Sequence, residues 1–535
     1  MSKYSRRVSR MLAMVAIGAV ALTGCAGNDD NDENSSGSGG ATTTAFGILG
    51  DQGDGGTPVS GGTLSYATYA PVTSLDPTVT QPAGATGGSE MAAVYDVLMR
   101  YDTETQTFEP QLAKSFEESS DHLTWTLKLR DGVTFSDGTP LNADAVVASI
   151  DRYNQRRGAN SQVYTQMVKS TEATDASTVV FTLNQPWRTF PAMLAYGHGM
   201  IVAPSSQQGD KFTPIGAGPF TVTNLAPQQE LDLKARPDYW GGAPNLDGLK
   251  FVAIAAEQPK VDALKTNGVD MIYLRNAETV NAAKDEFPGY IETVSMSMVG
   301  QLNNAEGRPG SDPRVRQAIA YAVDPEVLNQ RARNGQGMPG TDMFQPWSIW
   351  HGDTSGITPD AAKAKELVEQ AKADGFDGRI TYVGVNEPNA QQIALAVQAQ
   401  LNAVGFDVVL ETTSNITDMV KRLYVDRNYD MSFGAYSISD VAPEIRLFSS
   451  LSSTSTNNIL GYKNPEMDEL LAKVLSAPDE SAQKAAINEI QQLVNTDQPF
   501  LAWGAGTNFV AWGDNVYRVS PTVDGIMLFD KAFKK

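Results

Sequence analysis

Short runs in which apolar and polar residues alternate recur through the first half of the chain, and such runs are typical of half-buried β-strands. The clearest run, LTWTLKL, has its apolar residues at every second position: Leu123, Trp125, Leu127 and Leu129. An Asp-Gly pair at 131–132 predicts a turn, after which residues 133–135 would begin a returning strand. Residues 61–69 and 177–184 alternate in the same way, so we expect further strands on both sides of this turn.

The second half of the chain has apolar residues at helical spacing, often directly after a signal for a helix start. Asp312 precedes Pro313 and Thr358 precedes Pro359, which is the order expected of an N-cap followed by the first helical residue. Between residues 379 and 411 an apolar run, a helical stripe and a second apolar run follow one another. Strand, helix and strand at this spacing predict a βαβ unit, so we expect an α/β fold with parallel sheet in this half.

The first 60 residues follow a different pattern from the rest. Basic residues are followed by an uncharged apolar run over residues 11–22, which is too short to span a bilayer and matches a secretory signal peptide. The run ends in Leu-Thr-Gly-Cys, which resembles the lipobox of bacterial lipoproteins. That resemblance implies a signal peptide over residues 1–24, a diacylglyceryl group on Cys25, and a flexible, acidic, Gly/Ser-rich tether over 25–60. The alternative is an ordinary signal peptide followed by a free cysteine.

Composition narrows the class of protein. The chain has 535 residues, of which 41% are hydrophobic and 19% charged, so it is long enough for two or more lobes, each with its own core. Its single cysteine excludes an internal disulfide. A formal net charge of −21 argues against binding nucleic acid or anionic lipid through a basic face. No later apolar stretch is long enough to cross a membrane, so attachment would depend on the lipid alone.

No catalytic pattern stands out in the sequence. The chain has three histidines, none of them in a HExxH motif, and no zinc-ligand cluster, P-loop or strand-linked GxGxxG. We therefore expect no catalytic residues, no metal site and no cofactor. A carboxylate-pair enzyme stays open at this point, because 62 acidic residues make any such pair uninformative.

Six stretches of the chain, taken as an ordered set, resemble one family. This family is the large extracytoplasmic solute-binding proteins of peptide-type ABC transporters (family 5, dipeptide/oligopeptide-binding class). The longest runs from YDVLMRYDTETQTFEP to NADAVVASIDRY, over residues 95–153. The others are GGTLSYATYAPVTSLDP, PIGAGPFTV, ARPDYWGGAPNLDGLKF, DPRVRQAIAYAVDPEVL and GYKNPEMDELLAKV. Together they extend the resemblance over nearly everything from Gly61 to the C-terminus.

The resemblance implies a two-lobed α/β clamshell of the periplasmic-binding-protein type (type II, large peptide-binding class), with an extra subdomain in lobe I. Lobe I would be discontinuous, formed by residues 61–299 together with a C-terminal return over 505–535. Lobe II would comprise residues 300–504. Two hinge strands would join the lobes, and the ligand would be enclosed between them.

The function implied by the resemblance is capture of di- or oligopeptides and their delivery to a membrane permease. The partners would be the permease and its ATPase subunits, and the protein would be a monomer held by its lipid on the extracytoplasmic face of the cell membrane, at the cell surface or in the periplasm. Alternatives with the same fold are binding of a nickel chelate, an oligosaccharide or an opine. Alternatives of another class are a lipid-anchored hydrolase and a signalling receptor.

One segment resembles the place where peptide-binding members carry an aspartate that pairs with the peptide's ammonium group. In GAYSISDVAPEIRLF this resemblance offers Tyr436 and Asp440. The segment departs from the family pattern, because Ala442 replaces the usual acid before Pro443 and the spacing differs by a residue. The alternative for Asp440 is a cap for the helix that begins near Pro443.

The remaining candidate ligand residues each have a structural alternative. Arg446 could bind a carboxylate or lie on a helix surface. Trp347 and Trp503 could line the cleft or pack in the core. Asn303 could bond to the ligand backbone or belong to a turn. Gly218 is expected near the cleft, where it meets a requirement of backbone geometry.

Overall fold

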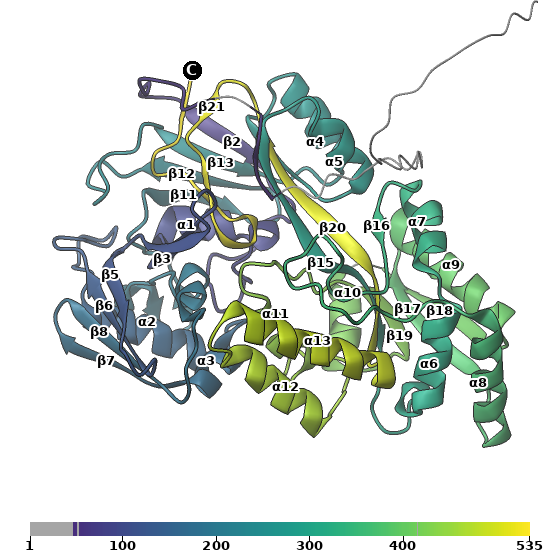
Figure 1. Ribbon diagram of the computed structural model, residues 1–535. Helices are drawn as coiled ribbons and strands as arrows, with labels where there is room; N and C mark the ends of the chain where they lie inside the picture. Colours follow the sequence, from purple (N-terminus) through teal and green to yellow (C-terminus); the bar gives the residue numbers. More distant parts are fainter. Residues whose placement is uncertain (1–45, 51–52, 415) are drawn as a thin grey trace, which may run out of the picture. The chain divides into compact units, whose positions relative to one another are not determined.

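Twelve strands form one mixed sheet in the computed structural model, which describes residues 46–50, 53–414 and 416–535 (Figure 1). Ten of these strands follow one path across the sheet: β11 (Phe220–Ala226), β12 (Glu230–Ala235), β13 (Gly248–Val252), β2 (Thr63–Ala67), β14 (Met271–Leu274), β20 (Phe500–Trp512), β15 (Gly289–Leu302), β19 (Met431–Gly434), β17 (Arg379–Val385) and β18 (Asp407–Thr413). We call β11–β14 with the elements packed on them lobe I, and β17–β19 with theirs lobe II.

Strands β15 and β20 pair with each other in antiparallel fashion and belong to both lobes. The lobe I part of β20 also pairs with β14, and the lobe II part of β15 also pairs with β19. The register between β15 and β20 shifts between Val294 and Met298, where Met296 has a φ of 49°. The short strand β16 (Met338–Pro339) pairs with β20 at Gly504. The regular hydrogen-bond ladder of β15 and β20 is therefore interrupted between the lobes, between Val294 and Met298 of β15 and near Gly504 of β20.

The core of lobe I combines the start and the end of the chain. Helix α1 (Gly88–Tyr95) packs beside β23 (Met527–Leu528), and the Met527 N–H donates to the Ser89 hydroxyl. The Tyr101 N–H donates to Thr522 Oγ1 at 2.7 Å. The other short elements of the C-terminal segment are β21 (Val516–Tyr517), β22 (Ser520–Pro521), the 3₁₀ turn η6 (Val523–Gly525) and β24 (Phe533–Lys534).

A second sheet in lobe I has the order β5 (Ala113–Glu118), β6 (Thr124–Leu129), β8 (Thr178–Leu183) and β7 (Val168–Asp175). Helices α2 (Ala143–Gln155) and α3 (Ser161–Met167) and the 3₁₀ segment η2 (Phe190–Ala195) pack with it. The alternating strand predicted at 123–129 is confirmed, but the returning strand at 133–135 is wrong. Strands β5 and β8 already occupy both edges of β6, so Thr134 forms only an isolated bridge with Pro140.

Lobe II contains the predicted βαβ unit. Strands β17 and β18 pair in parallel and α9 (Pro388–Ala403) connects them, while α6 (Pro313–Ala322), α7 (Pro325–Arg333) and α8 (Ala361–Ala373) complete this core. Asp312 caps α6 as predicted, by accepting from the Arg314 N–H. The start predicted for α8 at Thr358 is wrong, because Asp360 is its N-cap and accepts from two helix N–H groups.

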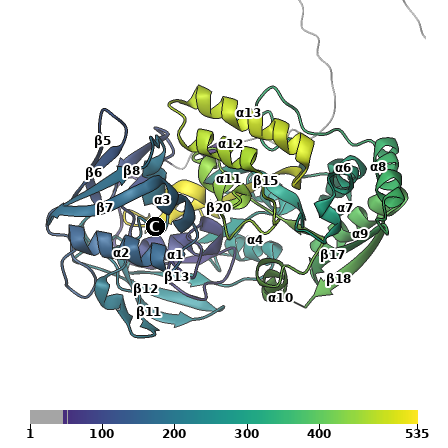
Figure 2. The same cartoon turned by 90° about the horizontal axis from the view of Figure 1, so that it is seen from below.

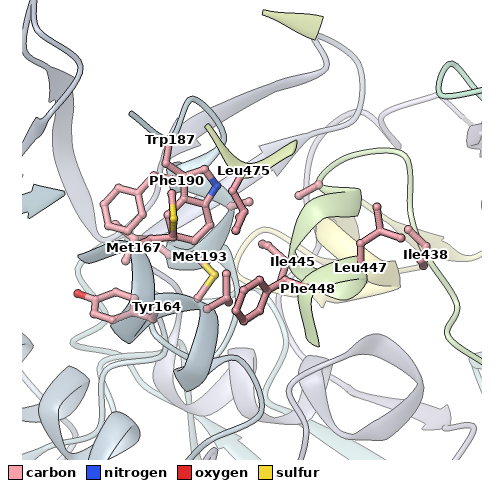
Figure 3. Close-up of a cluster of buried hydrophobic side chains, with 14 of the residues drawn as sticks. Tyr164, Met167, Trp187, Phe190, Met193, Ile438, Ile445, Leu447, Phe448 and Leu475 are labelled. Carbon is pink, nitrogen blue, oxygen red and sulfur yellow. The ribbon is translucent and has the colours of Figure 1, made fainter. Parts of the chain in front are cut away.

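Three further helices, α11 (Pro443–Leu451), α12 (Pro465–Leu475) and α13 (Glu480–Asp497), contribute apolar side chains to a buried cluster that also contains residues of lobe I. Helix α11 packs against α3, as two perpendicular views show (Figure 1, Figure 2). Figure 3 shows Trp187, Phe190 and Met193 of lobe I in the same buried cluster as Ile445 and Phe448 of α11. One apolar core therefore runs across this part of the lobe boundary.

Strand β1 (Phe46–Leu49) pairs with residues 289–292 of β15. It lies inside the segment 25–60 for which the sequence analysis predicts a flexible tether, and that prediction is wrong for these four residues. The apolar run FGIL supplies a strand for a β15 edge that is otherwise open at this level. Cys25 and the signal peptide predicted over 1–24 lie outside the described residues.

The remaining elements are short connections around the two lobes. They are η1 (Gly84–Thr86), β3 (Met99–Asp102), β4 (Thr107–Pro110), η3 (Pro204–Ser206), β9 (Gln207–Gln208), β10 (Lys211–Phe212), α4 (Glu257–Lys265), α5 (Ala277–Ala283), η4 (Pro309–Ser311), α10 (Ile416–Val420) and a π-helical turn at Lys421–Val425.

Candidate functional site

A small polar pocket of about 20 Å³ lies where the two lobes meet. Lobe I contributes Gln81, Pro82, Asn160, Tyr196 and Asp524 to its wall. Lobe II contributes Ser437, Ser439, Ala442, Ile445 and Arg446, all from α11 or from the loop that precedes it. At this volume the pocket has room for about one water molecule, so a solute held between the lobes would need them to move apart.

The loop between β19 and α11, residues 435–442, is fixed from the lobe II side by Asp440. Its two carboxylate oxygens accept hydrogen bonds from Ser348 Oγ at 2.7 Å and from the Ile349 N–H at 3.1 Å. Its backbone carbonyl accepts from the Trp350 indole at 2.9 Å. Burial raises the pKa of Asp440, while the bonds from Ser348 and Ile349 act in the opposite direction. The side chain therefore anchors the loop and does not cap α11.

The same loop is hydrogen-bonded to lobe I at three consecutive residues. Ser437 Oγ accepts from the Arg275 guanidinium at 2.8 Å. Ile438 and Ser295 of β15 exchange both backbone hydrogen bonds at 2.8 Å. Ser439 Oγ donates to Glu292 at 2.6 Å. The loop is thus held by both lobes, and its position depends on how the lobes are arranged.

Arg446 and Asp524 face one another across the cavity from opposite lobes. Their closest charged atoms, Arg446 Nη2 and Asp524 Oδ2, are 4.0 Å apart. When the Gln81 amide is oriented with its oxygen toward Arg446, that oxygen accepts from both Nη atoms at 2.7 and 2.8 Å. Burial raises the pKa of the Asp524 carboxyl, although Arg446 and Arg275 favour its charged form. The cavity therefore offers one cationic and one anionic wall.

Glu292 lies near the start of β15 and is only 1% exposed. One of its oxygens accepts from Ser439, whereas Oε2 has no hydrogen-bond partner among the described residues. Burial and the nearby carboxylates of Asp524 and Asp440 raise the pKa of Glu292 well above its usual range, and Arg275 only partly opposes this. Together these effects raise the pKa of Glu292 to about 8.

The aromatic residues predicted for the site lie mainly in packed surroundings. Trp503 is 1% exposed, and its ring stacks with Phe433. Tyr436 is buried, and its ring meets Phe500 edge-on. Trp347 is partly exposed and donates to Gln345 Oε1 at 3.3 Å. None of the three lines the cavity described above.

Asn303 and Gly218 are engaged by the protein itself. The Asn303 amide donates to the carbonyls of Arg427 and Tyr429 and accepts from the Ala305 N–H. Gly218 packs so closely on α1 that a Cβ atom there would lie 2.6 Å from the Ala93 carbonyl oxygen. Its N–H donates to the Val94 carbonyl.

Among the residues predicted from sequence, only Arg446 lines the cavity in the described part of the chain. Ligand contacts of Asp440, Tyr436, Asn303, Trp347, Trp503 and Gly218 stay predictions.

Glu292, Asp524 and Arg275 were not predicted from the sequence. Glu292 had a readable signal, because it is the one charged residue in the otherwise uncharged strand sequence GYIETVSMSMVGQL. Arg275 directly follows the buried strand β14, a weaker signal of the same kind. Asp524 had none, since its approach to the cavity depends on the fold of the C-terminal segment.

No group of three or more His, Cys, Asp or Glu side chains is arranged to hold a metal ion in the described ranges. No helix within those ranges has the length and apolarity needed to cross a membrane.

Comparison with known proteins gives a consistent result. Residues 107–458 match the profile of the bacterial extracellular solute-binding proteins, family 5. The probable D,D-dipeptide-binding periplasmic protein DdpA of Escherichia coli K12 is 27% identical over 449 residues, which cover 80% of this chain and 86% of DdpA.

Two solved structures extend the comparison. The periplasmic binding protein DppA of Helicobacter pylori, in complex with the peptide STSA, superposes with a TM-score of 0.75 at 23% identity, covering 89% of this chain and 98% of DppA. NikA of Brucella suis, in complex with Fe(III)-EDTA, gives a TM-score of 0.71 at 22% identity, covering 89% of this chain and 100% of NikA. These likenesses confirm the predicted two-lobed α/β fold.

Proposed function

Because this chain belongs to the bacterial extracellular solute-binding proteins of family 5, we propose that it is the substrate-binding subunit of an ABC importer for peptides. The relative named for D,D-dipeptide binding and the neighbour solved with the peptide STSA support a peptide ligand. The observation that carries the proposal is the cavity at the lobe boundary, with Arg446 on one wall and Asp524 on the other. The charged atoms of Arg446 and Asp524 are 4.0 Å apart, so the two side chains would have to separate before they could bind the carboxylate and the ammonium of a short peptide.

The work of the protein is differential binding, with no bond broken in the ligand. A ligand favours the closed arrangement only as far as it binds that arrangement more tightly than the open one. We place the lobe boundaries at 61–299, 300–504 and 505–535. The register shift in β15 and the irregularity at Gly504 support hinges near 299 and 504.

We propose further that the mature protein begins at a diacylglyceryl-modified Cys25 after removal of residues 1–24. The protein would be a monomer on the extracytoplasmic face of the membrane, and its partners would be a permease and its ATPase subunits. A lipid anchor raises the local concentration of the binding protein at the permease without restricting closure of the lobes. Mass spectrometry of the membrane fraction tests this, because an unmodified Cys25 would contradict it.

A metal chelate is the second candidate ligand, because the structure of NikA with Fe(III)-EDTA has the same fold. The peptide is favoured, since the cavity wall carries an opposed cation and anion and no imidazole. An oligosaccharide or an opine is the remaining alternative, and a hydrolase or a signalling receptor would use the same cavity differently.

Thermal unfolding of the full chain in the presence of dipeptides, oligopeptides, sugars, opines and Fe(III)-EDTA tests the function. A saturating ligand that binds only the folded state raises the Tm. We expect the rise with peptides, without their hydrolysis. Arg446→Gln should lose the response, whereas Arg379→Gln, at an exposed position on β17, should keep it. A rise with only sugars, opines or the chelate would contradict peptide binding.

A further inference from the structure

We propose that the N-terminal segment of the chain is a strap that docks on lobe I at two places and leaves the folded protein at Phe46, beside the interruption in β15. The strap consists of residues 46–50 and 53–62. The docking does not rest on the proposed function. One consequence does rest on it: a lipid on Cys25 would hold lobe I near the pivot of the two lobes and leave lobe II to move.

The first docking place is the edge of β15 in lobe I. Residues 46–49 pair with residues 289–292 in antiparallel fashion. Leu49 packs against a buried apolar cluster of lobe I. A Cβ atom at Gly50 would lie 3.0 Å from the side chain of Pro288, so the two backbones approach closely after the strand as well. The strap therefore meets the strand that joins the lobes both through its backbone and through close packing.

The second docking place is formed by the C-terminal segment of lobe I. The Arg518 guanidinium donates to the Asp54 carboxylate at 3.1 Å, to the Asp54 carbonyl at 3.0 Å and to the Gly56 carbonyl at 2.8 Å. Between these two acceptor residues, Gly55 lies against the ring of Tyr517. A Cβ atom at Gly55 would lie 2.5 Å from that ring, so a side chain there would push the strap away from lobe I.

The strap then continues into β2 while it stays on lobe I. The Gly61 N–H donates to the Asn245 carbonyl at 2.8 Å, and the Gly62 N–H donates to the Asp247 carboxylate at 3.0 Å. Each of the contacts named for the strap is made with lobe I. Because none of these contacts crosses the lobe boundary, opening and closing of the lobes does not require the strap to detach.

The end of the strap lies close to the place where the lobes are joined. Strand β1 runs antiparallel to β15, so its first residue, Phe46, is the one nearest to lobe II along β15 and pairs with Glu292. The interruption in β15 begins at Val294, about 7 Å further along the strand. A point near the axis of a rotation moves least. A membrane anchor that leaves the protein here would therefore not be pulled when lobe II moves.

Two glycines of the strap provide a matched pair of variants. Gly53 and Gly55 have similar left-handed backbones, with φ of 63° and 70°. A Cβ atom at Gly53 would meet no other atom within 4 Å, whereas one at Gly55 would overlap the Tyr517 ring. Alanine at either position introduces similar backbone strain, so the two variants differ in whether the strap still fits on lobe I.

The measurement is limited digestion of the full chain by thermolysin without ligand, with the new N-termini identified by mass spectrometry. Thermolysin cleaves before bulky apolar residues, and the strap offers it Ile48, Leu49 and Val59. The cleavage rate follows the fraction of molecules in which the strap is detached. We expect slow cleavage of the wild type and of Gly53→Ala, and cleavage about 10-fold faster for Gly55→Ala.

Two further pairs of variants test the other contacts of the strap. Arg518→Gln should accelerate the cleavage in the same way, whereas Arg379→Gln, at an exposed position on β17, should not. Gly47→Pro tests the strand pairing, because proline cannot adopt the φ of 120° found there. Ser38→Pro, which lies before the strap, is its control. Circular dichroism of each variant separates a detached strap from a loss of folding.

Three results would overturn the proposal. The first is equally fast cleavage of the strap in the wild type and in all variants. The second is faster cleavage in the presence of a peptide that raises the Tm, because the strap would then leave lobe I on closure. The third is a dimer that Gly47→Pro dissociates, because β1 would then come from a second copy. If no peptide raises the Tm, or if the protein is absent from the membrane fraction, the proposed function or the anchor fails, and the digestion still decides the docking.

Discussion

Replacing Phe448 by alanine should weaken ligand binding, although Phe448 does not line the cavity. Phe448 lies on α11, is 3% exposed, and belongs to the buried cluster that also contains Trp187 and Met193 of lobe I (Figure 3). If the lobes separate in the open form, this side chain loses its lobe I neighbours. The apolar contact therefore stabilises the closed form selectively.

The magnitude follows from the burial of this side chain. Full burial of a phenylalanine contributes about 1.5–3 kcal/mol, and Phe→Ala in a packed core costs about 3–5 kcal/mol because a cavity is left behind. Part of that cost falls on both forms, since Phe448 also contacts its own lobe. If about 2–3 kcal/mol falls on the closed form alone, ligand affinity should drop about 30- to 100-fold, at 1.4 kcal/mol per factor of ten.

The assay compares Phe448→Ala with Phe406→Ala, which is 5% exposed and lies in a cluster confined to lobe II. Both variants should lower the Tm without ligand. Titration calorimetry with the best peptide of the screen should show weaker binding only for Phe448→Ala. If both variants bind the peptide with wild-type affinity, the apolar boundary is not remade on closure and the reasoning is refuted.

Three further substitutions test other parts of the argument. Glu90, fully buried with neither carboxylate oxygen paired in the described residues, has its pKa raised by burial to about 8. The folded state therefore holds a proton that the unfolded state has released, and stability should fall by roughly 1.4 kcal/mol per pH unit between about pH 5 and 8. Urea unfolding of Glu90→Gln across this range should lack that slope, and an unchanged slope would contradict the assignment.

Burial raises the pKa of Asp76, but the hydrogen bonds from Arg152 and Thr78 lower it further, so the net shift is downward. Breaking the pair with Arg152 by Asp76→Asn should cost about 3 kcal/mol at pH 7. Because this stability is lost as the pH falls through the lowered pKa, the difference from wild type should shrink below about pH 4. A difference that is the same at pH 7 and pH 3 would argue against the pair. Gly218→Ala should lower the Tm by several degrees, because the new Cβ atom would clash with the Ala93 carbonyl. An unchanged Tm would show that α1 shifts enough to avoid this clash.

Local patterns were sufficient to predict many elements. The strands at 63–67, 124–129 and 178–183 and the βαβ unit of lobe II are confirmed. Alternation and helical spacing record which face of an element is buried, and that information is local. The errors at residues 133–135 and Thr358 are also local in origin. A turn signal does not tell which strand occupies the neighbouring edge, and two adjacent capping residues compete for one helix start.

The candidate site was predicted much less completely. Arg446 lines the cavity, but Asp440 is engaged within lobe II, and Glu292 and Asp524 were not foreseen. The residues of this site come from α11, β15, η6 and the segment near residue 81, which lie far apart in the chain. No spacing rule connects them, and one sequence without relatives gives no sign that they meet.

The sequence by itself determined the element types, the likeness to a family of solute-binding proteins and hence the two-lobed fold, because these depend on local periodicity and on long ordered motifs. Only the tertiary structure decided which charges face the cavity and which are already paired. Which partner a carboxylate has depends on groups that come from distant parts of the chain: Ser348 for Asp440, Ser439 for Glu292 and the Arg446 guanidinium, at 4.0 Å, for Asp524.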